Sequence, residues 1–224
     1  MDIKETIRDF FKEIEGDDNH RYKSWEHCYN YFSLEDKEIN KDIACLHLAF
    51  YLASWGMYRG STFLLQKDYL IHMPAVKLII KRKNNLQNID FSRLEDRKAK
   101  EIIDFAKLIK KQYTDNIKIV KGKKKGINVS DALVSKILLG TLGCVPAYDR
   151  YFREGLKKHF ESGNEYKGIL TLNEESLLKI VEFYKKHKIY FDRVRREIKE
   201  KTGVKYPVMK LIDMYFWNKG FKKA

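Results

Sequence analysis

The amino-acid sequence predicts an all-α protein of roughly ten helices, folded as one globule with two helical lobes. Its 224 residues include only 3 Pro and 12 Gly, whereas a β sandwich needs many turn residues between short strands. Apolar residues recur at intervals of three and four, and no convincing run alternates with the period of two typical of a half-buried strand. A hydrophobic content of 44% suffices for a core and argues against disorder.

The first half of the chain contains five expected helices. Ile3 and Ile7 share one face of the first helix, and the sequence GDDN at 16–19 ends it. Pro74 suits the first turn of the fifth helix, where an N–H would have no intrahelical partner. A polar connector follows, which places the boundary between the lobes near residues 84–92. The five expected helices are residues 2–14, 20–32, 38–55, 62–69 and 74–82.

The second half adds a basic loop and the remaining helices. Residues 118–128 (KIVKGKKKGIN) are the most basic stretch and hold two glycines, so an exposed loop is expected there. Ser130 or Asp131 is expected to cap the helix that follows. The other expected helices are 92–113, 147–160, 174–187, about 190–202 and 207–218.

The charge balance predicts a polyanionic partner. The chain carries 45 Lys and Arg against 31 Asp and Glu, a formal net charge of +14, and its pI is near 9.5. Such a field attracts polyanions, so nucleic acid is the first expected partner and an anionic membrane surface the second. The alternative is that the charge serves solubility alone.

The sequence gives no sign of a metal, a disulfide or a membrane segment. Cys28, Cys45 and Cys144 are far apart and form no CxxC pair, and the six His show neither HxxxH nor HExxH spacing. The N-terminus is charged and amphipathic, unlike a signal peptide, and no apolar run approaches the ~18 residues of a membrane helix. We therefore expect a cytoplasmic protein that needs no cofactor and no metal.

Residues 118–149 combine features that suit a phosphate backbone. A loop with glycines leads to a capped helix, whose N-terminus presents backbone N–H groups to a phosphate. A glycine turn and Pro146 then lead to Asp149, which is either a catalytic carboxylate facing the same site or simply the N-cap of the next helix. The cations expected to contact DNA are Lys121, Lys123, Lys124, Lys125, Lys136 and Arg150.

The segment GKKKGINVSDALVSKILLGTLGCVPAYD, residues 122–149, resembles the helix-hairpin-helix superfamily of DNA glycosylases. The resemblance implies that residues 122–131 grip the DNA backbone and that Asp149 stabilises a cationic sugar or activates water. The chain departs from the family in two ways: one extra residue separates Pro146 from Asp149, and the hairpin glycines are spaced differently. Where two-step members carry a Schiff-base lysine, this chain has residues 130–132, and Lys136 comes about one turn later. The resemblance therefore implies a monofunctional enzyme.

Two further segments hold candidate substrate-binding residues. An enzyme that acts on a base extrudes it, holds it between aromatic faces and binds its polar edge. Residues 51–69 (YLASWGMYRGSTFLLQKDY) contain the aromatic, hydroxyl, amide and arginine groups that this requires, although the same aromatics could simply pack in a core. Residues 21–32 add a second carboxylate. The expected substrate-binding residues are Trp55, Tyr58, Arg59, Ser61, Gln66 and Glu26.

The sequences SWEHC, LASWGMYRGS and LGCVPAYDRYF together are similar to bacterial glycosylases of phage defence that attack glucosylated cytosine. This resemblance implies that the partner is double-stranded DNA, including phage DNA with modified bases, and that the excised base is bulky.

Two other functions compete with this hypothesis. Arg153 and His159 fit the Arg-x(4–6)-His spacing of HEPN-type helical ribonucleases, although Gly155 between them weakens a helix. A non-catalytic DNA-binding protein would show affinity with strong salt dependence and no product. The basic sequence at 193–201 fits either a face that follows phosphates or an ordinary solvated helix side.

Overall fold

The computed structural model describes residues 2–60, 62–117, 119–120, 123–124, 127–160 and 168–221, with the side chains of 119–124 left aside. The described part is all-α, as the sequence predicts, apart from one two-residue ladder. Its nine α-helices are α1 (Ile3–Glu15), α2 (Ser24–Ser33), α3 (Lys41–Ser54), α4 (Met73–Leu86), α5 (Asp96–Asn116), α6 (Asp131–Thr141), α7 (Arg150–Phe160), α8 (Glu174–Thr202) and α9 (Val208–Phe221).

Short 3-10 helices replace some of the expected structure. The helix expected at 62–69 is two separate 3-10 turns, η3 (Phe63–Gln66) and η4 (Tyr69–His72), because Asp68 accepts a hydrogen bond from the N–H of Leu70 and starts the second turn. The two helices expected at 174–187 and about 190–202 are confirmed as the two segments of α8, between which the backbone kinks at His187 (φ −115°, ψ 16°). The other 3-10 helices are η1 (Arg21–Lys23), η2 (Asp36–Glu38) and η5 (Phe91–Arg93).

The helix-hairpin-helix element is not seen in the described residues. Between α5 and α6 the chain forms two short antiparallel strands, β1 (Ile119–Val120) and β2 (Lys123–Lys124), in which residue 119 pairs with residue 124. The predicted exposed loop therefore contains a small ladder. Ser130 does cap α6, because its Oγ accepts a hydrogen bond from the N–H of Leu133 at 3.2 Å.

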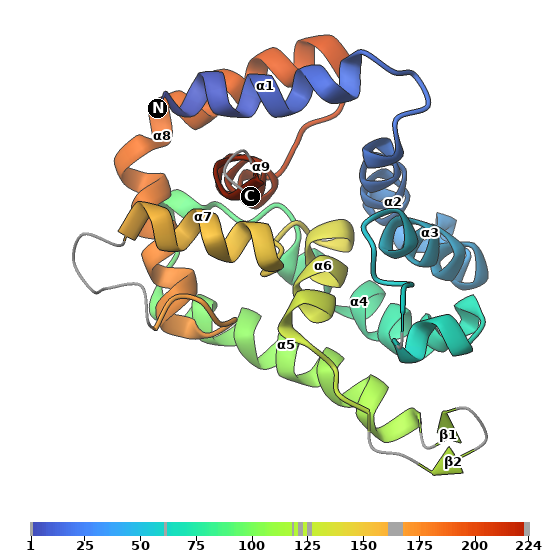
Figure 1. The fold of residues 1–224 in the computed structure, drawn as a ribbon. Helices are drawn as coiled ribbons and strands as arrows, with labels where there is room; N and C mark the ends of the chain where they lie inside the picture. Colours follow the sequence, from blue (N-terminus) through green and yellow to red (C-terminus); the bar gives the residue numbers. More distant parts are fainter. Residues whose placement is uncertain are drawn as a thin grey trace.

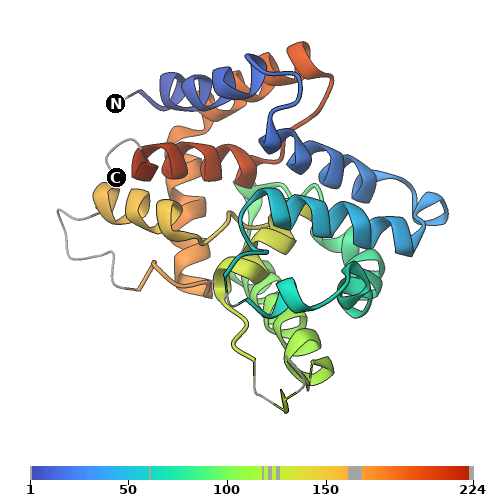
Figure 2. The ribbon, with the colours of Figure 1, turned by 45° about the vertical axis from the view of Figure 1, so that its right-hand side comes forward.

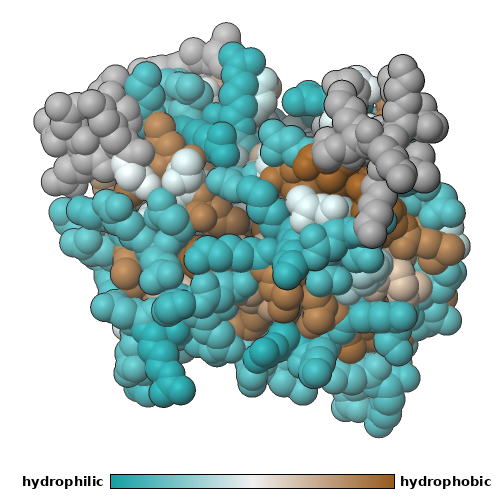
Figure 3. Space-filling model, turned by 90° about the horizontal axis from the view of Figure 1, so that it is seen from below, coloured by the Kyte–Doolittle hydropathy of each residue, from teal (hydrophilic) through white to brown (hydrophobic). Residues whose placement is uncertain are grey.

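Helix α9 is the central element of the fold. It lies between α1 and α7 in two views, and it also contacts α8 (Figures 1 and 2). Buried apolar side chains from α1 to α9 form one continuous cluster. Its members come from the sequence both before and after residues 84–92. Seen from below, hydrophilic side chains cover much of the surface and apolar ones lie between them (Figure 3). No helix in the described part of the chain is both long enough and apolar enough to cross a bilayer.

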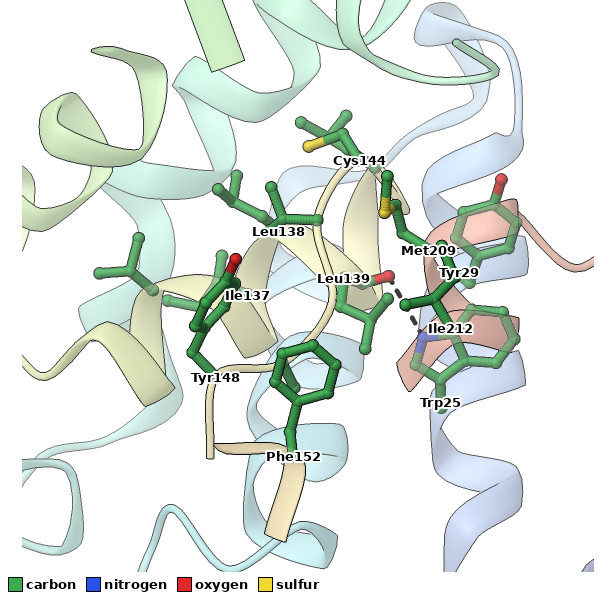
Figure 4. Close-up of a cluster of buried hydrophobic side chains, with 14 of the residues drawn as sticks. Trp25, Tyr29, Ile137, Leu138, Leu139, Cys144, Tyr148, Phe152, Met209 and Ile212 are labelled. Carbon is green, nitrogen blue, oxygen red and sulfur yellow. Dashed lines mark hydrogen bonds between the residues drawn. The ribbon is translucent and has the colours of Figure 1, made fainter. Parts of the chain in front are cut away.

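The core joins α6 and the turn after it to α2 and α9. Residues 133–141 of α6 are all buried, so this helix has no solvent-facing side beyond its first turn. Trp25 of α2 donates a hydrogen bond from its indole to the carbonyl oxygen of Leu139 at 3.2 Å (Figure 4). Tyr148 and Phe152 pack beside the same helix (Figure 4). The turn that leads to Asp149 is therefore anchored in the core.

Candidate active site at the start of helix α7

The backbone before Asp149 is held from two sides. The chain reverses after α6 at Gly143, which has a φ of +63°. The N–H of Ala147 then donates to Asp213 Oδ1 at 3.0 Å, and the N–H of Tyr148 donates to Ser135 Oγ at 2.8 Å. These bonds fix the place where the next residue, Asp149, enters α7.

The Asp149 carboxylate has two partners. Its Oδ1 accepts a hydrogen bond from the N–H of Phe152 at 3.1 Å, so it caps α7 as the simpler of the two sequence interpretations predicts. Its Oδ2 lies 3.1 Å from Lys136 Nζ. The Asp149 side chain is 15% exposed, so solvent reaches it. Capping and a role at a reactive site are therefore compatible.

Lys136 is not the exposed phosphate contact that we expected. Its side chain is only 5% exposed, because α6 is buried around almost its whole circumference. Besides Asp149, its ammonium donates to the carbonyl oxygen of Trp55 at 2.9 Å. A buried charge needs such partners. The amine that seemed one turn too late in the sequence lies beside the candidate catalytic carboxylate.

A second buried ion pair lies in α9. Lys210 Nζ is 3.3 Å from Asp213 Oδ2, and both side chains are 2% exposed. Burial raises the pKa of Asp213 to about 6, while the charge of Lys210 opposes this shift. Burial also lowers the pKa of Lys210. Since Asp213 holds the N–H of Ala147, this pair supports the turn that carries Asp149.

Aromatic rings surround the two lysines. The ammonium of Lys210 lies 4.5 Å from the ring centre of Trp55, and that of Lys136 lies 5.7 Å from it. The ring of Tyr22 stacks on Trp55 with centroids 4.4 Å apart, and Trp217 is edge-on to Trp55 at 6.5 Å. The indole N–H groups of Trp55 and Trp217 are buried and lack a hydrogen-bond partner among the described residues. Buried donors without a partner are groups that a polar ligand or water would satisfy.

Tyr58, another expected substrate-binding residue, belongs to a buried relay. Its hydroxyl lies 2.7 Å from Nε2 of His72, and Nδ1 of His72 lies 2.7 Å from the hydroxyl of Tyr113. Burial lowers the pKa of His72 to about 3, so the imidazole is neutral and one nitrogen donates while the other accepts. This arrangement holds Tyr58 in place and leaves its ring half-buried.

The buried histidine predicts a loss of stability in acid. Unfolded His72 takes up a proton near pH 6.5 and folded His72 only near pH 3, so the free energy of unfolding should fall as pH drops between these values, by roughly 3 to 5 kcal/mol. Urea titrations from pH 7 to pH 4 would measure this slope. His72→Phe should reduce the slope to the part that His159, with its pKa lowered to about 4, still contributes, and His27→Gln at an exposed site should leave it unchanged. Equal slopes in all three proteins would contradict the prediction.

The other expected site residues are dispersed. Arg59 is exposed, and its guanidinium lies next to Gly56. Gln66 is also exposed. Glu26 accepts a hydrogen bond from the hydroxyl of Tyr206. The exposed Arg150 has its guanidinium carbon 5.8 Å from the ring centre of the next residue, Tyr151. Ser61, Lys121 and Lys125 lie outside the described residues, as do the side chains of Lys123 and Lys124.

Comparisons of the chain with protein-family models, with curated proteins and with solved structures found no match.

Sequence reasoning missed the second ion pair and the indole donor of α9. A signal was present: Lys210 and Asp213 are charged residues three positions apart in the apolar run VMKLIDMYFW. In a helix that is apolar on every side, a charged residue is either buried with a partner or placed where the helix end reaches solvent. Lys210 and Asp213 are buried and paired with each other. The described residues contain no group of three His, Cys, Asp or Glu that could hold a metal ion.

The pair of residues proposed for a ribonuclease lies on α7. Burial among aromatic rings and the nearby ammonium of Lys219 lower the pKa of His159 to about 4. His159 Nδ1 is 3.2 Å from Lys219 Nζ. Nε of Arg153 is buried and has no hydrogen-bond partner among the described residues. A neutral histidine could act as a base, so the ribonuclease alternative stays a prediction.

Proposed function

We propose that the protein is a DNA glycosylase that hydrolyses the N-glycosidic bond of a modified or damaged nucleotide and leaves an abasic site. The observation that carries the proposal is Asp149, a partly exposed carboxylate fixed at the start of α7 and paired with the buried amine of Lys136 at 3.1 Å. The net charge of +14 supplies the attraction for DNA.

Asp149 suits a reaction that builds positive charge on a sugar. Departure of the base with the bonding electrons leaves a cationic deoxyribose, and a preorganised carboxylate beside it lowers the barrier. Water then adds its oxygen to the sugar carbon and loses a proton to Asp149 or to solvent. A carboxylate offers about four lone-pair sites. Phe152 and Lys136 use two of those of Asp149, which leaves capacity to orient this water.

Lys136 acts in this proposal by orienting Asp149, and water is the nucleophile. Its ammonium is already bound by Asp149 and by the carbonyl oxygen of Trp55, and its side chain is 5% exposed. An amine held in this way is poorly placed to attack a sugar carbon. The enzyme is then monofunctional and needs no cofactor or metal.

The substrate class follows from the aromatic surroundings and from the resemblance stated above. The unsatisfied indole N–H groups of Trp55 and Trp217 are suited to a ligand that accepts hydrogen bonds, whereas the ring of Trp55 already has Tyr22 stacked on it and the Lys210 ammonium 4.5 Å from its centre. Bulky modified cytosine in double-stranded phage DNA is the proposed substrate, and anti-phage defence in the cytoplasm is the proposed role.

Base release from a panel of DNAs tests the proposal. We expect wild-type protein to produce alkali-labile abasic sites on uracil-containing, alkylated, hydroxymethylated or glucosylated DNA. Asp149→Asn should reduce the rate at least about 100-fold and retain DNA binding, since the substitution removes charge from the reaction site. His159→Ala should retain activity. No product on any DNA would overturn the proposal, and activity lost only in His159→Ala would favour a ribonuclease tested on RNA.

Borohydride reduction during the same reactions tests the role of Lys136. With water as the nucleophile, no protein–DNA adduct forms, and Lys136→Met lowers the rate because Asp149 loses its partner. A trapped adduct that disappears in Lys136→Met would instead identify this amine as the nucleophile.

A further inference from the structure

The cations of the second half of α8 fall on two sides of the helix. This half lies beside α1, as Figures 1 and 2 both show. On that side the charges are neutralised: Arg193 Nε is 3.4 Å from Glu197 Oε1, and Arg8 binds the same carboxylate at 2.8 Å. Lys201 Nζ lies 3.0 Å from Glu15.

The other side of this half-helix lines a hollow of about 560 Å³ together with η5 and the segment before α9. The cations around this basic hollow are Lys188, Arg195, Arg196, Lys199 and Lys205. Two carboxylates, Asp90 and Asp192, also line it. Cations therefore outnumber carboxylates by five to two.

Both carboxylates of the basic hollow are already engaged. Asp192 pairs with Lys188 and accepts a hydrogen bond from the Tyr184 hydroxyl. Asp90 caps η5 through the N–H of Ser92 and lies 3.8 Å from Arg93. Hydrogen bonds from the hydroxyl and the N–H of Ser92 lower the pKa of Asp90, so this carboxylate stays ionised and bound to its own turn.

The remaining cations are available for a ligand. Arg195 donates its Nε–H to the carbonyl oxygen of Tyr206 at 2.6 Å, which fixes the arginine and leaves its terminal N–H groups unused by that bond. Arg196, Lys199 and Lys205 form no ion pair with a carboxylate among the described residues. A fixed arginine beside three exposed, unpaired cations is suited to phosphate oxygens.

We propose that the basic hollow binds the phosphate backbone of a nucleic acid and is a second contact surface, none of whose residues belongs to the Asp149 site. The uncommitted cations on the helix, from Arg195 to Lys199, span about 6 Å along it, and Lys205 lines the same hollow. Phosphates follow one another at about 3.4 Å per strand along a duplex axis, so this span covers about two of them and exceeds what one phosphate group needs. The inference rests on the proposed function only for the choice of DNA as the polymer.

The test compares two double variants with the same change in net charge. Arg196→Glu with Lys199→Glu alters the basic hollow, and Lys100→Glu with Lys107→Glu alters two cations of α5 that both contact Asp104. Binding of a fluorescent DNA duplex is measured between about 50 and 200 mM salt. We expect the hollow variant to lose at least about 10-fold in affinity and its salt slope to fall by about 2, while the control changes less than about 3-fold. The corresponding Gln variants, with thermal unfolding, exclude misfolding as the cause.

Three outcomes would overturn the proposal or separate it from the proposed function. Equal losses in both double variants would mean that only overall charge attracts DNA, which overturns it. Tripolyphosphate that binds the hollow without competing with DNA would identify a small-anion site and also overturn it. If no DNA releases a base but binding still depends on the hollow, the proposed function fails and this inference stands.

Discussion

Gly155→Ala should destabilise the protein by more than about 3 kcal/mol, because it forces apart two helices that touch through their backbones. A Cβ atom built on Gly155 in α7 would lie 1.9 Å from the carbonyl oxygen of Phe216 in α9. A Cβ on Gly220 in α9 would likewise lie 1.9 Å from the carbonyl oxygen of Tyr151 in α7. Backbone atoms cannot rotate away as a side chain does, so the helices must separate and the surrounding core must loosen.

Thermal unfolding would measure this effect, and Gly16→Ala provides the matched control. At Gly16 the backbone is helical, with a φ of −71°, and an added Cβ would make an ordinary contact of 3.5 Å. For a chain of this length we expect Gly155→Ala to lower Tm by about 10 °C and Gly16→Ala to change it by at most about 2 °C. Similar Tm values for the two variants would show that α7 and α9 are not packed this closely.

The close contact between α7 and α9 also explains Gly155, the glycine that weakens the ribonuclease motif in the sequence. Within a single helix, glycine only costs stability, and nothing local indicates a reason for it. Its reason lies in α9, about sixty residues later, where the backbone of Phe216 takes up the space of a side chain. A period of three to four predicts helices but carries no information about which residue of one helix faces which residue of another.

Helix boundaries were predicted well because they depend on local sequence, whereas contacts between helices do not and could not be predicted. Helix α1 differs by one residue at each end from the expected 2–14, because its apolar face and its ends are both local signals. The prediction of one helix over 62–69 was wrong because Asp68 accepts a hydrogen bond from the N–H of Leu70 and begins a new turn there. Hydrophobic periodicity does not report such a bond.

The candidate site shows the same limit. The sequence identified Asp149 through its turn, but its distance of thirteen residues from Lys136 gave no sign of contact. The contact depends on the reversal of the chain at Gly143. Glycine is required there because its φ is positive and because a Cβ atom would lie 2.4 Å from Cγ of Pro207. Lys136 was then misjudged as exposed, because a lysine in a helix usually faces solvent.

The buried charges around this turn depend on one another. Lys210 and Asp213 are each 2% exposed, and Asp213 also accepts the N–H of Ala147 two residues before Asp149. A buried pair can be replaced by apolar groups at little cost, whereas removal of one partner leaves an uncompensated charge. The loss of unfolding free energy in a single variant therefore measures the cost of burying the remaining charge without a partner. Comparison with the double variant gives the interaction energy between the two charges.

We expect Lys210→Met and Asp213→Asn each to lower the free energy of unfolding by about 3 to 5 kcal/mol, and the double variant to be at least about 2 kcal/mol more stable than the sum predicts. Lys107→Met is the control, because its exposed pair with Asp104 should contribute no more than about 1 kcal/mol. Urea unfolding at pH 7 measures all four variants. Additive losses in the double variant would mean that the two charges do not stabilise each other, and the turn that carries Asp149 would then depend on Asp213 alone.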